Sequence, residues 1–432
     1  MEKFSDFCSE RIRQRTKPTP SILQIALKKG FSQRSILWLI KMKSQYSISE
    51  REINGQYGKR KIPVLSFFTG GGFLDLGFEL AGFEVIWTNE TNGIFADMYE
   101  YGITSWRRSI YPGSKDAKIS DKRSIAAITS KDILDLAFTG KRPPFFGIIG
   151  GPPCPDFSQG GKNLGGGGDR GHLSQIFVDR ICEINPDFFV FENVPGLLRH
   201  KKHREFLAQL ELQLENHRYC LDLRLLNVLE LGWPQNRERL ILIGIKRNIS
   251  RACIKRELFR GERGWFPWPE YPEYRGAKKR FRWPGVELLN KTPQKPSDIP
   301  DKLMIYHLLD GDNPPSLQPN GLEAFKPYSD KFFTTCEGDV KGKSFKRLHR
   351  YRYSPTACYG NNEVHLHPWE NRRLTVREAM RIQGIPDTYT LQPDMPLTAK
   401  FALIGNGVPI PLAENVARSI YRIFGDLLKL GA

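Results

Sequence analysis

The chain has 432 residues, of which 40% are hydrophobic, enough for one core domain of ordinary size and one or two smaller modules. Lys and Arg total 65 against 47 Asp and Glu, a net charge of +18, which favours a polyanionic partner such as nucleic acid. The seven cysteines contain no CxxC pair, which argues against a disulfide scaffold or a structural zinc site, and we expect a reduced, cytoplasmic setting.

Residues 1–60 are basic and predicted to form a helical extension, with no signal-peptide core. Four positions match the apolar-and-turn spacing of a helix-turn-helix, with Ser32 able to cap its second helix: Ala26, Gly30, Ile36 and Leu39. Such a unit could bind DNA upstream of the protein's own gene. A helix packed on the core has the same spacing. We favour this structural interpretation over DNA binding.

Residues 61–245 alternate short apolar runs with helical patterns, which predicts a doubly wound α/β sheet. The candidate strands are Val64–Phe68, Glu84–Trp87, Phe145–Gly150, Phe188–Glu192 and Leu240–Ile245. Residues 246–372 are rich in Trp, Pro, Lys and Arg, and this change of composition predicts a separate, irregular module. Helical periodicity returns in residues 373–432, at Thr375–Gln383 and Pro411–Phe424.

A glycine-rich turn, Thr69-Gly70-Gly71-Gly72, follows the first predicted strand, and the next strand ends at Glu90. Glycines at this place let the backbone approach a ligand closely, and an acid about 20 residues further on can accept the ribose hydroxyls of a nucleoside cofactor. Asp132 is a candidate for a third carboxylate, which would hold an adenine amino group. A purely structural turn would show the same glycines.

Cys154 lies in Gly150-Gly-Pro-Pro-Cys-Pro-Asp-Phe-Ser158, directly after an apolar strand. The prolines before it fix the backbone and place the thiol at the carboxyl edge of the sheet, where α/β proteins bind ligands. Glu192 ends the next strand, and Arg237 and Arg239 lead into the last one. A nucleophilic thiol with an acid and two arginines beside it is the indicated chemistry, although a buried Cys and a solvated charge run are the plainer alternatives.

Six segments in this order resemble the motifs of DNA cytosine-5 methyltransferases. They are Phe68-Thr-Gly-Gly-Gly72, Pro152-Pro-Cys154, Glu192-Asn-Val194, Gln235-Asn-Arg237-Glu-Arg239, the run from Arg373 to Gly384, and Gly405-Asn-Gly-Val-Pro409. The resemblance covers 61–245 and 373–432. It implies a Rossmann-like S-adenosylmethionine-dependent methyltransferase fold, with a smaller target-recognition domain inserted at 246–372. It also implies a monomer that acts on double-stranded DNA in a bacterial restriction–modification system.

The chemistry of the reaction accounts for the residue types. Cytosine C5 is a poor nucleophile until a thiolate adds to C6, so Cys154 is expected to form a covalent adduct with a flipped-out base. Glu192 would hold a proton at N3, and Arg239, with Arg237 nearby, would bind O2 and favour the thiolate. This reaction needs no metal.

By the same resemblance, nine residues would line the S-adenosylmethionine pocket: Phe68, Gly70, Gly72, Glu90, Asp132, Ile133, Leu173, Asn406 and Val408. Two positions depart from the family pattern. Pro155-Asp156 follows the cysteine where the family often has Gln, and Thr91 stands where an aromatic often stacks on adenine.

Two other functions remain open at this point. A tRNA cytosine-5 methyltransferase has the same fold, but its typical Cys-Phe-Thr tripeptide does not occur in this chain. A catalytically inactive DNA-binding regulator would usually lose the Cys or the Glu motif, and both are present.

Overall fold

The computed structural model describes residues 61–153, 171–288, 291–342, 344–356, 358–359 and 364–429. The chain from Lys59 onward forms one compact unit. The predicted helix-turn-helix in residues 1–60 lies outside the described residues, as do Cys154 and Pro155-Asp156. What is predicted for them stays a prediction.

A six-stranded sheet has the order β2-β1-β3-β4-β6-β5. Its strands are β1 (Ile62–Phe67), β2 (Phe83–Asn89), β3 (Gly147–Gly150), β4 (Phe188–Asn193), β5 (Tyr219–Asn227) and β6 (Glu238–Lys246). The first four are parallel, whereas β6 runs antiparallel between β4 and β5. All five predicted strands are confirmed. The sequence analysis did not predict strand β5. Asp222, Arg224 and Asn227 interrupt its apolar residues, so it lacks the continuous apolar run that marks the other strands.

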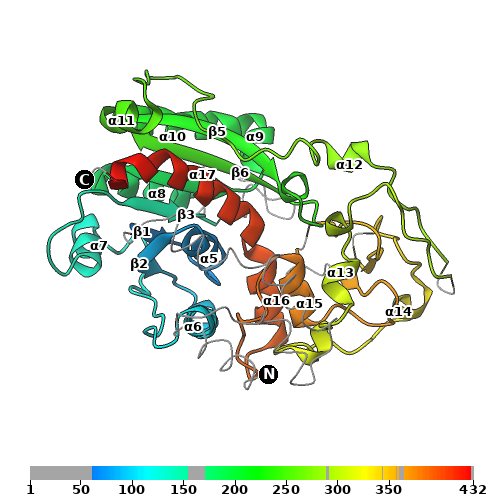
Figure 1. Ribbon diagram of the computed structural model, residues 1–432. Helices are drawn as coiled ribbons and strands as arrows, with labels where there is room; N and C mark the ends of the chain where they lie inside the picture. Colours follow the sequence, from blue (N-terminus) through cyan, green and yellow to red (C-terminus); the bar gives the residue numbers. More distant parts are fainter. Residues whose placement is uncertain are drawn as a thin grey trace, which may run out of the picture. The chain divides into compact units, whose positions relative to one another are not determined.

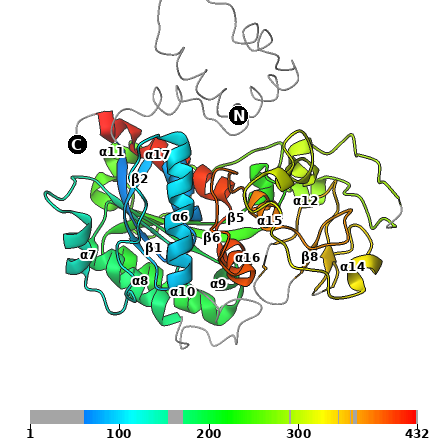
Figure 2. The same ribbon diagram turned by 90° about the horizontal axis from the view of Figure 1, so that it is seen from below.

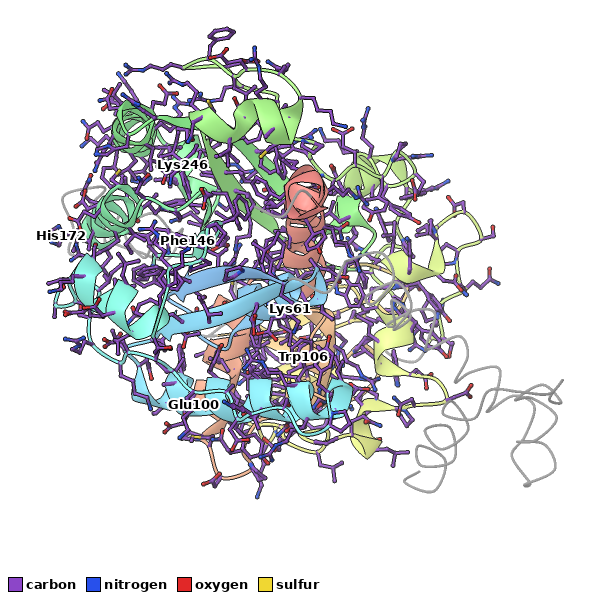
Figure 3. The ribbon with its side chains drawn as sticks, turned by 60° about the vertical axis from the view of Figure 1, so that its left-hand side comes forward. Lys61, Glu100, Trp106, Phe146, His172 and Lys246 are labelled. Carbon is purple, nitrogen blue, oxygen red and sulfur yellow. The ribbon has the colours of Figure 1, made fainter. Side chains whose placement is uncertain are left out.

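Helices cover both faces of the sheet (Figures 1 and 2). One face packs against α7 (Ser130–Ala137), α8 (Gly171–Ile184), α9 (Gly196–Arg199) and α10 (Lys201–Asn216). On the other side lie α5 (Phe73–Leu80) and α17 (Ile410–Lys429), and α5 shares a second core with α6 (Gly93–Ile110). Phe146 and Trp106, both labelled in Figure 3, belong to the first and the second core respectively.

The C-terminal segment completes the second core. Its helices α15 (Val376–Ile382) and α16 (Leu397–Asn406) pack with α5 and α6. Tyr389 lies between them and donates a hydrogen bond to the Gly71 carbonyl at 2.9 Å. The predicted helices Thr375–Gln383 and Pro411–Phe424 correspond to α15 and α17. The end of the chain is therefore part of the same body as the glycine turn.

Between β6 and α15 the chain is mostly irregular. Its short elements are η3 (Arg247–Ile249), α11 (Ser250–Ile254), α12 (Ala277–Arg280), η4 (Asp301–Leu303), α13 (Tyr306–Leu309), η5 (Pro315–Leu317), α14 (Lys331–Thr334), β7 (Lys346–Arg347) and β8 (His365–Leu366); η2 (Val228–Leu231) precedes β6. The fully buried Arg347 organises part of this region by donating to the carbonyls of Thr335, His367 and Glu370. Buried carbonyls that a guanidinium satisfies can replace regular secondary structure.

The first part of this region packs on the six-stranded sheet. Trp265 donates its indole N–H to the Leu221 carbonyl at 2.9 Å, and the Phe266 amide donates to the Asp222 carboxylate at 2.8 Å. These contacts hold the chain against the outer strand β5 up to about residue 268. They favour a small domain that begins downstream of residue 246, and the boundary itself stays a prediction.

Replacing Gly102 by Ala should destabilise the protein. A Cβ at Gly102, in the middle of α6, would lie 2.1 Å from Cζ of Tyr389. Overpacking of this kind costs about 1–3 kcal/mol, more than Ala gains over Gly from helix propensity. Urea unfolding should show the loss. Gly93→Ala in the same helix is the control, because no atom lies within 4 Å of its added Cβ; equal stability of the two variants would contradict the proposed packing.

Candidate active site

The glycine turn after β1 is tied to the end of β2 by one carboxylate. Glu90 accepts a hydrogen bond from the Gly70 amide at 2.8 Å through Oε2, and from the Asn92 amide at 2.8 Å through Oε1. Gly70 and Gly72 have left-handed φ angles of 53° and 72°, which favour glycine. The Glu90 side chain therefore sets the shape of the turn as well as being available to a ligand.

Space around the turn fits a ligand that approaches the backbone. A Cβ built on Gly70 meets no atom within 4 Å, so the backbone is open there. A Cβ on Gly72 would lie 2.5 Å from the Tyr99 ring, so the inner side is closely packed. Phe68, also with a positive φ of 55°, forms a T-shaped ring contact with Phe177 of α8. The turn is thus packed against α6 at Gly72 and open to a ligand at Gly70.

A second carboxylate beside Glu90 is Asp121, which the sequence analysis did not single out. The Glu90 amide donates to the Asp121 carbonyl at 3.3 Å, and the Asn89 side chain donates to the same oxygen at 2.9 Å. The Asp121 side chain is buried and accepts from Arg123. Residues 111–129 contain no regular element, so no periodic pattern marks this position in the sequence.

Asp132 and Ile133 have other local roles. Asp132 forms a capping box with Thr129 at the start of α7, and its side chain is 44% exposed. Ile133 is fully buried in the core beneath the sheet. The prediction that these two residues line the cofactor pocket stays a prediction. Because the Asp121 backbone is hydrogen-bonded to the end of β2, Asp121 is a second candidate for the adenine contact.

The remaining predicted pocket residues come from two other elements. Leu173 is half-buried on α8, Asn406 is the exposed last residue of α16, and Val408 is buried. A Cβ on Gly407 would lie 2.0 Å from the Phe73 ring, so the Asn406–Val408 segment lies against the start of α5. The fold therefore brings this late motif to the glycine turn.

Glu192 and Arg239 form a buried ion pair where β4 ends and β6 begins. Nε of Arg239 lies 2.8 Å from Oε1 of Glu192, and both residues are only 8% exposed. A Cβ on Gly151 would lie 2.6 Å from Oε2 of Glu192, so the carboxylate touches the backbone that leads to Cys154. Burial raises the pKa of Glu192, and Arg239 and Arg237 oppose that rise. The carboxyl group is thus suited to hold or share a proton.

Arg237 has a different place from Arg239. Its guanidinium is fully buried and donates to the carbonyls of Gly405 at 2.7 Å and Gly407 at 2.9 Å. Burial, followed by the neighbouring Arg239, lowers the pKa of Arg237. Arg237 thus holds the backbone on either side of Asn406, and its predicted part in the reaction stays a prediction.

A buried acid lies beneath the glycine turn. Asp75 of α5 accepts hydrogen bonds from the Ser66 hydroxyl at 2.5 Å and the Tyr99 hydroxyl at 3.1 Å. Burial raises the pKa of Asp75 from 3.8 to about 7. This network joins β1, α5 and α6 directly under the turn.

Other kinds of site find no support in the described part of the chain. No cluster of three or more His, Cys, Asp or Glu side chains there could hold a metal ion. None of the helices described has the length and apolar character needed to cross a membrane.

Comparison with known proteins decides the family. The model of the C-5 cytosine-specific DNA methylases matches residues 62–422. This chain belongs to that family. It is a DNA (cytosine-5-)-methyltransferase, and the family implies S-adenosylmethionine as its methyl donor.

Two curated relatives cover most of this methylase. The type II methyltransferase M.NmeDI of Neisseria meningitidis serogroup C is 40% identical over 377 residues, covering 85% of this chain and 86% of the relative. The type II methyltransferase M.FnuDI of Fusobacterium nucleatum is 28% identical and covers 85% and 96% respectively. The crystal structure of the S. pombe Dnmt2 methyltransferase matches with a TM-score of 0.52 at 14% identity, over 85% of this chain and 99% of the other, which shows the shared fold.

The stability of the methylase should depend on pH through Asp75. Because the folded state raises the pKa of Asp75 to about 7, it binds the proton more tightly than the unfolded state, and this contribution to stability is lost as pH rises from about 4 to about 7. Between pH 5 and 8 the loss is on the order of 2–3 kcal/mol. Urea unfolding should show a flatter pH dependence for Asp75→Asn than for the wild type. The exposed Asp394→Asn should keep the wild-type dependence; if Asp75→Asn keeps it too, Asp75 is not the group that titrates.

Proposed function

We propose that this methylase uses Cys154 as its nucleophile and Glu192 and Arg239 to stabilise the attacked base. The observation that carries the proposal is the buried Glu192–Arg239 pair, packed against Gly151 at the carboxyl edge of the sheet. From Gly151 the chain continues through two prolines to Cys154. The thiol, the acid and the arginine thus belong to neighbouring strand ends.

Each residue has a distinct part in the reaction. The thiolate of Cys154 forms a bond to C6 of a cytosine extruded from the duplex, and the electron pair of the C5–C6 double bond becomes available at C5. Glu192, whose pKa is raised by burial, holds a proton at N3 and limits the charge that develops there. Arg239 orients Glu192 and directs its remaining donors to O2 of the base.

The strand edge next to this site has the features of a nucleoside-binding pocket. Glu90 would accept the ribose hydroxyls, Asp121 would accept the adenine amino group, and the open backbone at Gly70 would allow close approach. Arg237 keeps Asn406 at the wall of the pocket through the Gly405 and Gly407 carbonyls. S-adenosylmethionine bound there supplies an electrophilic methyl group for C5.

We further propose that the enzyme is the modification component of a restriction–modification system and recognises a specific duplex sequence. The support is its likeness to type II methyltransferases of Neisseria and Fusobacterium over most of their lengths. The irregular region between β6 and α15 would read the target, because its Arg, Lys and aromatic side chains suit phosphates and base edges. Bisulfite sequencing of DNA from expressing cells should show one fully methylated motif, and purified enzyme should methylate duplex DNA but not tRNA.

Cys154→Ser should abolish methyl transfer while leaving DNA and cofactor binding intact. A serine hydroxyl is far less ionised than a thiol near neutral pH, so addition to C6 should stop. Duplexes containing 5-fluorocytosine should trap the wild-type enzyme covalently and should not trap the variant. Cys182→Ser on α8 is the control, because Gln213 already hydrogen-bonds that sulfur. Turnover by Cys154→Ser at the wild-type rate would end the mechanism proposed.

Asp121→Ala should weaken S-adenosylmethionine binding about 10-fold or more, since a charged hydrogen bond contributes ~1.5–3 kcal/mol. Asp132→Ala should leave the affinity near that of the wild type, although it removes the α7 capping box. Calorimetry at matched folded fractions compares the two directly. The opposite ranking would return the adenine contact to Asp132.

A further inference from the structure

We propose that a basic ridge on the catalytic domain, formed by Lys201, Lys202 and Arg204 at the start of α10, binds the phosphate backbone of the DNA duplex beside the flipped cytosine. All three side chains are exposed. This contact would be separate from the target-reading region between β6 and α15. It rests on the enzyme's action on DNA, and it does not depend on the identity of the nucleophile.

The ridge lies at the same edge of the sheet as the active site. Helix α10 ends at Asn216 and leads into β5, whose first residue, Tyr219, pairs with Lys246 at the opposite edge. The first turn of α10 must therefore lie at the edge where β4 ends with Glu192 and Asn193. Figure 1 shows α9 and α10 beside β5 and β6.

Side-chain contacts connect the ridge to the catalytic pair. Arg199, the last residue of α9, forms an ion pair with Glu238 at 2.5 Å. Glu238 is followed by Arg239, which pairs with Glu192. His203, buried on the inner side of α10, contacts the Gly196 carbonyl at 3.2 Å and so holds α10 to α9. A duplex whose cytosine enters the Glu192 site would thus have the ridge next to it.

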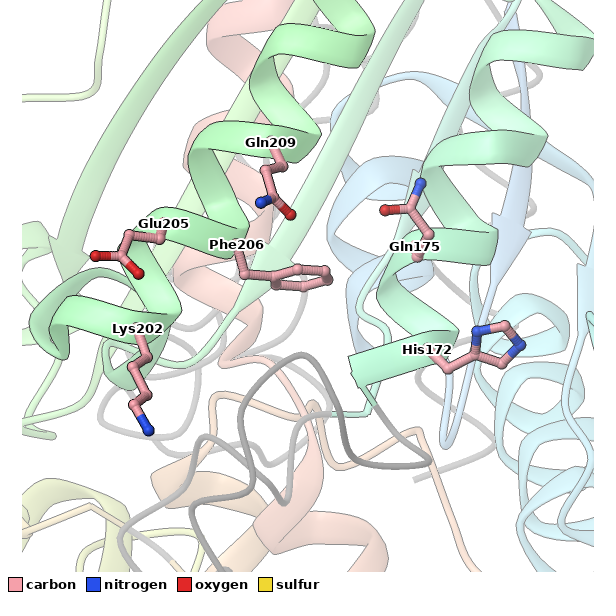
Figure 4. Close-up of a pocket in the computed structure, with 6 residues that line it drawn as sticks. All are labelled: His172, Gln175, Lys202, Glu205, Phe206 and Gln209. Carbon is pink, nitrogen blue, oxygen red and sulfur yellow. The ribbon is translucent and has the colours of Figure 1, made fainter.

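The charges of the ridge are not used within the described structure. No ion pair joins Lys201, Lys202 or Arg204 to an acid among the residues described. Many other arginines there are paired, such as Arg263 with Glu211 and Glu215. In Figure 4 the Lys202 ammonium points away from Glu205, and both residues line a hollow together with His172 and Gln175 of α8. These cations are therefore available to an external anion.

Helix stability does not explain cations at this position. The N-terminal end of a helix carries partial positive charge, so a Lys or Arg there is unfavourable for the helix. The first turn of α10 has no acidic residue, and its N-cap, His200, makes no side-chain capping bond. Three exposed cations at a helix end without a capping side chain suit a polyanion. In a DNA methylase, the polyanion that reaches this edge is the substrate duplex.

The test replaces all three cations: Lys201→Gln/Lys202→Gln/Arg204→Gln. The matched control removes three exposed cations at the opposite edge of the sheet, Lys141→Gln/Arg218→Gln/Arg251→Gln. Binding of duplex DNA is measured from 50 to 300 mM salt, on a duplex that contains the target site and on one that lacks it. Melting curves of each variant establish that it is folded.

We expect the ridge variant to lose affinity for both duplexes to a similar extent. The slope of log Kd against log salt should fall by about 2–3, because each neutralised phosphate contributes roughly 0.9. The ratio between target and non-target binding and the methyl-transfer rate at saturating DNA should stay at wild-type values. The control variant should keep the wild-type slope.

Three results would overturn the proposal. One is a folded ridge variant whose slope of log Kd against log salt equals that of the wild type. This result would mean that the ridge does not bind DNA. Another is an equal loss in the control variant, which would show only a general effect of net charge. The third is a slower rate at saturating DNA with unchanged binding, which would assign the residues to the reaction itself. Because binding is measured without turnover, the result is independent of the Cys154→Ser experiment.

Discussion

A buried guanidinium joins two parts of this methylase that lie 168 residues apart in sequence. The Arg237 side chain is almost completely buried, and it donates hydrogen bonds to the backbone carbonyls of Gly405 and Gly407, on both sides of Asn406. A buried cation is costly unless its donors are satisfied, so these two carbonyls fix the relative positions of β6 and the segment before α17. The neighbouring Arg239 pairs with Glu192, so the segment around Asn406 lies near the same edge of the sheet as this ion pair.

This arrangement explains why an irregular region can be inserted without disturbing the site. The indole of Trp233 and the amide of Gln235, just before β6, both donate to the Ile382 carbonyl at the end of α15. The segment just before β6 is therefore fixed to the end of α15 by hydrogen bonds that do not involve the irregular region between β6 and α15. What lies between can differ in length and sequence while the two ends stay fixed.

The sequence was sufficient for the strands with continuous apolar runs and for the acid at the end of β4. It was less informative where polar residues do structural work. In strand β5, Asp222 and Arg224 alternate with apolar residues, and the sequence analysis did not predict this strand. The Asp222 carboxylate accepts a hydrogen bond from the Phe266 amide, so the polar residue has a structural role. The sequence offers no sign that Asp121 lies beside Glu90, because its backbone carbonyl accepts hydrogen bonds from Glu90 and Asn89, which come from a distant strand. Arg237 and Arg239 are two residues apart and look alike in the sequence, but in the structure Arg239 pairs with Glu192 whereas Arg237 donates to the Gly405 and Gly407 carbonyls.

The contact of Trp265 with β5 has a consequence for the protein in concentrated solution. β5 is the last strand of the sheet, and the outer edge of such a strand offers carbonyls and amides to any other extended chain. Here the Leu221 carbonyl already accepts the Trp265 indole, and the segment around Phe266 covers the strand beside it. A second molecule cannot add a strand at that place. The segment that follows β6 thus protects the sheet from edge-to-edge aggregation.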